Sequence, residues 1–183
     1  EVLSPKPTYN SGRDLHFNNE MQGFFLAGKE LIETKDGGTN WTVNKNFTYA
    51  NSFDLLNEVG IVAQNFCQVS ITKDRASTWQ IQTLGAQDNL IYAKVFDNDN
   101  FVVASKNKIY STADGGTTWI TKTFNISATN IVYFTDKNTG FVGTTNGSIF
   151  KTTDGGNSWS QKISSNIIPS DYFTMYFYNT QIG

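Results

Sequence analysis

The segment STADGGTTW at residues 111–119 recurs almost unchanged as KTTDGGNSW at 151–159, and both copies end in tryptophan. Two further segments have the same form, ETKDGGTNW at 33–41 and ITKDRASTW at 71–79. The four tryptophans of the chain are the last residues of these four segments, and their spacings of 38, 40 and 40 residues define an internal repeat. A fixed period of this length is the sequence signature of a repeat architecture.

Each repeat contains four short runs rich in Val, Ile, Phe and Thr, separated by turns rich in Gly, Asn and Asp. Such runs predict β-strands, and no window shows the sustained 3.6-residue period of a helix. Four strands in roughly 40 residues are typical of one blade of a β-propeller. We therefore predict an all-β fold, a β-propeller built of four-stranded antiparallel blades.

The repeat also divides the chain. We expect one propeller domain over residues 1–183, with blades at approximately 14–49, 53–86, 91–125 and 131–165. Residues 1–7 and 173–183 repeat parts of a unit and predict partial-blade strands. The chain is accordingly expected to be a fragment of a larger propeller, or to close with a partner copy. Open blade edges favour self-association, because an unpaired strand edge is a template for pairing.

The repeated segment, here called the Asp–Trp motif, has the features of a tight hairpin turn. Glycine tolerates the positive φ that such turns require, and an aspartate carboxylate accepts hydrogen bonds from nearby amides. We expect the tryptophan to lie between neighbouring blades. The second copy has Arg75-Ala76-Ser77 where Gly-Gly-x is expected, so its turn must differ or be strained. The predicted structural residues are Thr34, Asp36, Gly38, Trp41, Thr72, Asp74, Trp79, Thr112, Asp114, Gly116, Trp119, Thr152, Asp154, Gly156 and Trp159.

The four copies resemble the Asp-box, or bacterial neuraminidase repeat, of the form Ser/Thr-x-Asp-x-Gly-x-Thr-Trp. The segment GFVGTTNGSIFKTTDGGNSW at 140–159 is most similar to the propeller repeats of photosystem II assembly and stability factors. The resemblance implies that the motif lies on the turn between the third and the outer strand, away from the active face. It is specific for the fold and indicates little about function, since sialidases, glycoside hydrolases, sortilin-type receptors and assembly factors share it.

Composition limits the remaining classes. The net charge of −2 gives no basic footprint for nucleic acid, and no apolar run is long enough for membrane insertion. A single cysteine, Cys67, excludes an internal disulfide framework. Asp97-Asn-Asp99-Asn100 has some likeness to a calcium loop but lacks its glycine and later glutamate, so a strand–strand turn is the simpler interpretation. We predict no metal site and no cofactor.

Enzymatic alternatives differ in how well the residues support them. A sialidase needs three arginines around its substrate carboxylate, and the chain has only Arg13 and Arg75. A glycoside hydrolase with two carboxylates stays open, although the sequence pairs no two of its acidic residues. His16, between two apolar residues of a predicted strand, is interpreted as structural.

The interpretation that remains is a non-catalytic scaffold for protein–protein interaction or assembly, with a carbohydrate-active enzyme or glycan-binding module as the alternative. The partner is expected to be a protein or a glycan, and the chain to be exported and bacterial. The loops after each outer strand vary most. The candidate partner-facing residues in them are Phe47, Tyr49, Asp88, Asn89, Ile167 and Tyr172.

Overall fold

The computed structural model describes residues 12–85, 87–127, 129–164 and Met175, and every regular element in these ranges is a β-strand. The strands form four separate antiparallel sheets of four, each in sequential order, and these sheets are called blades 1 to 4. The prediction of an all-β fold with four-stranded antiparallel units is confirmed. The expected partial strands at 1–7 and 173–183 lie outside the described residues, apart from Met175.

The strand bounds follow the repeat. Blade 1 contains β1 (Gly12–Phe17), β2 (Gly23–Ala27), β3 (Glu30–Thr34) and β4 (Thr42–Asn46). Blade 2 contains β5 (Ala50–Leu56), β6 (Val59–Gln64), β7 (Gln68–Thr72) and β8 (Gln80–Thr83). Blade 3 contains β9 (Tyr92–Val95), β10 (Phe101–Ala104), β11 (Lys108–Thr112) and β12 (Ile120–Thr123). Blade 4 contains β13 (Thr129–Phe134), β14 (Gly140–Thr144), β15 (Ile149–Thr152) and β16 (Ser160–Ile163).

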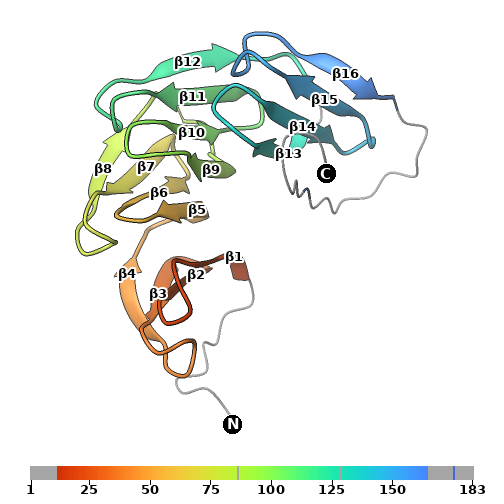
Figure 1. Ribbon diagram of the computed structural model, residues 1–183. Helices are drawn as coiled ribbons and strands as arrows, with labels where there is room; N and C mark the ends of the chain where they lie inside the picture. Colours follow the sequence, from red (N-terminus) through yellow and green to blue (C-terminus); the bar gives the residue numbers. More distant parts are fainter. Residues whose placement is uncertain (1–11, 86, 128, 165–174, 176–183) are drawn as a thin grey trace.

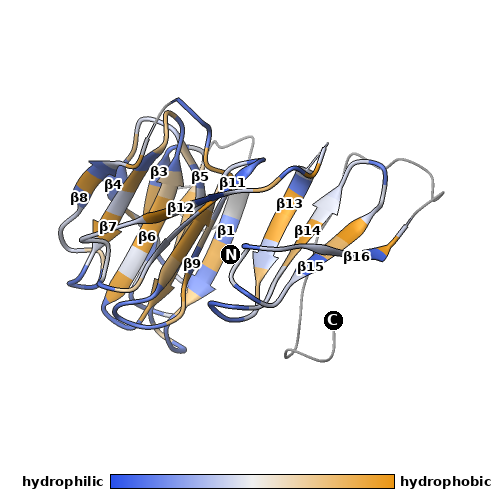
Figure 2. Cartoon of the chain, turned by 90° about the horizontal axis from the view of Figure 1, so that it is seen from above, coloured by the Kyte–Doolittle hydropathy of each residue, from blue (hydrophilic) through white to orange (hydrophobic). Residues whose placement is uncertain are grey.

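The blades follow one another along an arc, with the first strand of each on the inner side and the fourth on the outer side (Figure 1). Figure 2 shows the apolar strands of neighbouring sheets facing one another, with hydrophilic turns at the two ends. Three buried clusters occupy the spaces between successive blades, and none lies inside a single sheet. Stability therefore depends on contact between neighbouring repeats, as expected for stacked units that cannot bury a hydrophobic face alone.

The inner strands are joined by side chains that bind the backbone of the next blade. Asp14 Oδ2 accepts a hydrogen bond from the amide of Phe53 at 2.7 Å, and Asp54 Oδ2 accepts one from the amide of Val95 at 2.8 Å. The hydroxyl of Tyr92 accepts from the amide of Phe134 at 2.9 Å. Burial raises the pKa of Tyr92 well above its usual range, so this hydroxyl stays protonated at any physiological pH. These contacts satisfy amides at the edge of each sheet.

Blade 1 leaves one inter-blade face open. Leu15 and Phe17 are exposed there, whereas the residues at the matching positions of blade 2, Phe53 and Leu55, are buried against blade 1. The registers Phe17↔Gly23 and Leu55↔Gly60 establish this equivalence. The open face therefore has the apolar character of a blade–blade contact, as expected for a fragment of a larger ring.

Each motif tryptophan of blades 2, 3 and 4 packs against the apolar cluster that it shares with the preceding blade. Trp79 makes an edge-to-face contact with Phe47 of the preceding repeat, with ring centroids 5.4 Å apart, and Trp159 lies at the same distance from Phe124. In the interface between blades 2 and 3, Leu84 and Trp119 both pack against the shared cluster. These three tryptophans lie between blades, as expected, whereas Trp41 makes an edge-to-face contact with Phe17 of its own blade.

The indole nitrogens are satisfied unequally. Trp119 Nε1 donates to Gln82 Oε1 of blade 2 at 3.1 Å and to the carbonyl of Gly116 at 3.2 Å. The residue matching Gln82 in blade 1 is Asn44, which is shorter by one methylene. Both Asn44 Oδ1 and Trp79 Nε1 are buried without a hydrogen-bond partner among the described residues. The first blade interface thus contains an unpaired acceptor and an unpaired donor where the second has a bond.

We predict that Asn44→Gln will stabilise the protein, because the longer side chain can reach Trp79 Nε1. The expected gain in the free energy of unfolding is about 1 kcal/mol, the usual net value of one intramolecular hydrogen bond. Urea unfolding followed by tryptophan fluorescence measures it. The matched variant Gln82→Asn should lose stability by no more than this, since Trp119 retains its bond to Gly116. A destabilised Asn44→Gln protein would contradict the prediction.

Candidate functional site

The four Asp–Trp motifs share one hydrogen-bond pattern, described here for blade 3. Asp114 Oδ1 accepts from the hydroxyl of Thr112 and from the amide of Thr118, each at 2.8 Å, while Oδ2 accepts from the Thr118 hydroxyl at 2.6 Å. The Thr112 hydroxyl in turn accepts from the amide of Gly116 at 3.0 Å. The same set holds Asp36, Asp74 and Asp154, with the side-chain amide of Asn40 replacing the hydroxyl in blade 1.

This network stabilises the ionised carboxylates. The Thr118 hydroxyl, followed by its amide, lowers the pKa of Asp114 to about 2, and Ser158 lowers the pKa of Asp154 in the same way. The pKa of Asp74 is lowered mainly by the hydroxyl of Thr78, and that of Asp36 mainly by the amide of Asn40. All four carboxylates have their acceptor positions engaged within their own turns, which is the chemistry of a structural turn and unlike that of an acid–base catalyst.

The motif turns are also bonded to the turns between the first and second strands. The amide of Gly115 donates to the carbonyl of Asp99 at 2.9 Å, and the matching amides of Gly37, Arg75 and Gly155 make the same bond in their own blades. These two sets of turns lie at the same ends of the strands in every blade. Together they form one face of the arc, which we call the motif face. Gly116 has a second constraint: its φ is +86°, and a Cβ there would lie 2.4 Å from Ile71 Cδ1 of blade 2.

The second motif reproduces this geometry without glycine. Arg75 and Ala76 have φ values of 56° and 65°, close to those of Gly115 and Gly116. Of the two outcomes expected for this copy, strain is the one observed. Ala76 is buried in the cluster between blades 1 and 2, so its methyl group gains packing in return. Arg75 has only an exposed ion pair with Glu58 at 3.4 Å.

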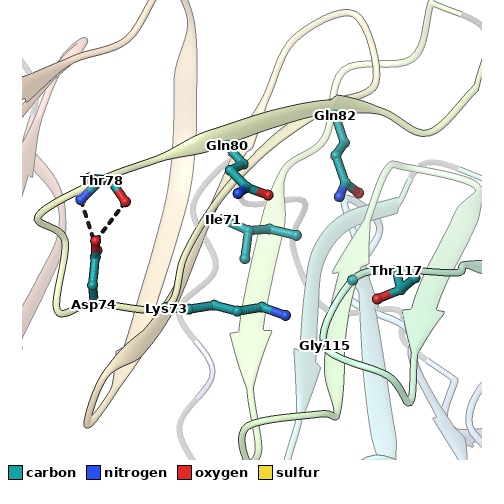
Figure 3. A pocket seen from close by; sticks show the side chains of 9 residues that line it. Ile71, Lys73, Asp74, Thr78, Gln80, Gln82, Gly115 and Thr117 are labelled. Carbon is teal, nitrogen blue, oxygen red and sulfur yellow. Dashed lines mark hydrogen bonds between the residues drawn. The ribbon is translucent and has the colours of Figure 1, made fainter.

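A groove of about 380 Å³ lies on this side of the molecule between the motifs of blades 2 and 3 (Figure 3). Lys73 extends across it toward Gly115, and Asp74 is bonded to Thr78 at its edge. Gln82, which also lines it, is bonded to Trp119. Gln82 therefore joins blades 2 and 3, while Asp74 is engaged within its own turn.

The opposite face of the arc, at the other ends of the strands, is called the loop face. It consists of the turns between second and third strands (28–29, 65–67, 105–107 and 145–148) and the blade-to-blade loops (47–49, 84–91 without residue 86, and 124–127). A larger cavity, of about 730 Å³, opens here between the loop that follows blade 2, the 105–107 turn of blade 3 and the first residues of blade 4. Its lining includes Asp88, Asn89, Lys106, Asn107 and Ile126.

The structure places the predicted partner-facing residues differently from one another. Asp88 and Asn89 line the cavity, and Asp88 forms an ion pair with Lys108. Tyr49 is on the same face and 50% exposed. Phe47 is a correction: it is only 6% exposed, because its ring packs against Trp79 in the core between blades. Ile167 and Tyr172 lie outside the described residues.

Sequence reasoning missed the turn at Phe66 and Cys67. Both residues have left-handed backbones, with φ values of 58° and 55°. Phe66 is 47% exposed and contacts Tyr49 edge to face, with ring centroids 5.5 Å apart, while Cys67 is buried. Left-handed turns are normally signalled by Gly or Asn, and Phe-Cys carries no such signal. The spacing of the repeat alone could have marked this position as a turn.

The other singled-out residues have local structural roles. Asp97 accepts from the amides of Asp99 and Asn100 and from the Asn100 side chain, which closes the turn between β9 and β10. His16 lies 4.0 Å from Asp54 on the neighbouring inner strand. Among the described residues, no group of three or more His, Cys, Asp or Glu side chains is placed to hold a metal ion. The same ranges contain no helix long and apolar enough to cross a bilayer.

Comparison with solved structures finds clear likeness in three-dimensional form at low sequence identity. YCF48 bound to D1 peptide superposes with a TM-score of 0.59 at 14% identity, over 95% of this chain and 89% of that one. YCF48 from Cyanidioschyzon merolae gives 0.70 at 16% identity, over 89% of this chain. An ancestral GH74 enzyme gives 0.68 at 15% identity, over 86% of this chain. The fold is that of a β-propeller.

The chain spans 59% of the Cyanidioschyzon merolae protein and 24% of the GH74 enzyme. No family model and no curated protein matches its sequence. The likeness therefore shows a fragment of a propeller and leaves the function to be inferred from the site.

We predict that Arg75→Gly will raise the free energy of unfolding by about 1 kcal/mol, because it removes the cost of a left-handed backbone at a side chain with no buried contact. Denaturant unfolding measures the change. Ala76→Gly is the matched control: the same relief is offset there by the loss of a buried methyl group, so no gain is expected. Equal gains in both variants would contradict this account.

The lowered pKa of Asp114 predicts an acid-sensitive stability. An aspartate in the unfolded chain has a pKa of about 3.9. Because the folded pKa is about 2, the stabilisation is complete above pH about 4 and is lost as the pH falls through about 2. Thermal unfolding across this range should show a falling midpoint. Asp114→Asn should be less stable at neutral pH and lose less on acidification; an equal loss in both proteins would contradict the prediction.

Proposed function

We propose that this chain is a non-catalytic β-propeller module that binds a protein partner through its loop face. The observation that carries the proposal is the contrast between the motif face and the loop face. The motif face repeats the same turn in every blade, whereas the loop face has different residues in each blade. A partner that binds once per molecule needs a surface where the repeats differ, and the cavity beside Asp88 and Asn89 is on that surface.

The comparisons support the general form of this proposal. One of the solved propellers, YCF48, is described as bound to D1 peptide, so a propeller of this shape can bind a peptide. We further propose that the four Asp–Trp motifs are Asp-boxes. Their shared carboxylate network and their place between third and fourth strands support this. We retain export from a bacterial cell as part of the proposal.

The alternative is a carbohydrate-active enzyme or a glycan-binding module, since GH74 enzymes share the fold. A hydrolase of this kind needs two free carboxyl groups across a cleft. Asp54 is bonded to Val95 and Lys94, and Asp88 is paired with Lys108. Asp97 and Asp136 accept bonds within their own turns. These engagements favour the binding module.

The test is a selection of displayed protein fragments from the source organism on the immobilised chain, with a glycan array and hydrolysis assays in parallel. We expect saturable binding of a purified fragment that Asn89→Glu abolishes without lowering the melting temperature. Asp114→Ala should do the reverse, lowering the melting temperature while the folded protein keeps its affinity. Turnover of sialosides or of plant or bacterial glycans, or glycan binding without fragment binding, would overturn the proposal.

A further inference from the structure

The turn at Phe66 and Cys67 has a backbone cost that packing explains for only one of its two residues. Two successive residues with positive φ form the type of hairpin turn that normally takes Asn-Gly, and a non-glycine side chain is strained at either position. Cys67 is fully buried in the cluster between blades 2 and 3, which offsets its share. Phe66 is half exposed, so burial does not explain its side chain. Strained positions of this kind cluster at functional sites.

Phe66 belongs to a fixed aromatic pair. Tyr49, from the loop between blades 1 and 2, meets it edge to face at an interplanar angle of 72°. The amide of Asn65 donates to the carbonyl of Tyr49 at 3.2 Å and joins the turn to this loop. The result is a half-exposed aromatic pair whose two supporting loops are joined by a backbone hydrogen bond. Half-exposed aromatic side chains in fixed positions are typical anchor points of protein interfaces.

The turn that carries Phe66 is bonded to the loop that lines the cavity of the loop face. The amide of Cys67 donates to the carbonyl of Asp88 at 2.6 Å, and Asp88 lines the cavity. The carboxylate of Asp88 is neutralised by Lys108. Lys106, also in the lining, is exposed and has no hydrogen-bond or ion-pair partner among the described residues. The cavity side of the site therefore has an excess of one positive charge, beside the amides of Asn89 and Asn107.

We propose that Tyr49, Phe66 and the cavity around Lys106 form one site for an extended peptide segment that carries an apolar and an acidic side chain. The apolar side chain packs on the aromatic pair, and the acidic side chain pairs with Lys106. This inference rests on the proposed function and specifies its ligand. A neutral glycan fits less well, because the two rings are nearly perpendicular and present no common flat surface, and because it would leave the ammonium group without a counter-charge.

The test is a selection of random phage-displayed peptides on the full chain, followed by titration of the synthetic peptides with variant proteins. Enriched peptides should combine an acidic residue with an aromatic or aliphatic one. Tyr49→Ala and Phe66→Gly should each weaken binding about tenfold or more, as anchor residues do. Lys106→Gln should weaken binding and reduce its dependence on salt. Lys162→Gln, the same charge change on exposed outer strand β16, should have no effect.

Phe66→Gly separates binding from folding. Glycine adopts positive φ without strain, so this variant should melt no lower than the parent protein while it loses peptide affinity. If the peptides bind but are insensitive to Tyr49, Phe66 and Lys106, this site is wrong while the proposed function stands. If enriched peptides lack acidic residues, or if only glycans bind, the proposed ligand is wrong. Failure of protein fragments in the earlier selection would instead remove the proposed function itself.

Discussion

The carboxylate at the centre of each Asp–Trp motif is the interaction on which the rest of the structure depends. In blade 3, Asp114 fixes Thr112 before the turn and Thr118 after it, so the next residue, Trp119, leaves the turn in one direction. That direction carries the indole into the cluster shared with blade 2. A turn network at the surface therefore determines how one sheet packs on another. Because the apolar clusters lie between blades, loss of this geometry would affect two repeats at once.

A second set of contacts acts at the inner edge of the blades. Asp14 of blade 1 and Tyr92 of blade 3 occupy matching positions and both bind an amide of the next inner strand, although one is a carboxylate and the other a phenol. Ser52 does the same in blade 2, accepting from the amide of Ala93 at 3.2 Å. Near their outer strands, neighbouring blades are thus joined by the repeated tryptophan. At their inner strands they are joined by polar side chains of different types that bind the backbone of the next blade.

This difference explains how much the sequence could predict. The period of the tryptophans and the alternation of the runs were sufficient for the propeller fold, because both are repeated. The bonds of Asp14, Ser52 and Tyr92 were not predictable, since unlike residue types share one role and no pattern links them. Phe47 was misinterpreted for a related reason. It follows an outer strand, where loops are usually exposed, and only the position of Trp79 in the next repeat shows that its ring is covered.

Two pairs of non-glycine residues have left-handed backbones, Arg75 with Ala76 and Phe66 with Cys67. The difference between these two turns indicates where a functional site is to be sought. At Arg75 and Ala76 the strained turn is held by the same bonds as three glycine-containing copies, so its conformation is imposed by the architecture. Phe66 and Cys67 have no such template in the other blades. Their turn is particular to blade 2, it leaves an aromatic ring half exposed, and it is bonded to Asp88, which lines the cavity of the loop face. A repeat protein can distinguish one partner only where a repeat departs from its copies, and this departure has a backbone cost that its own packing only partly offsets.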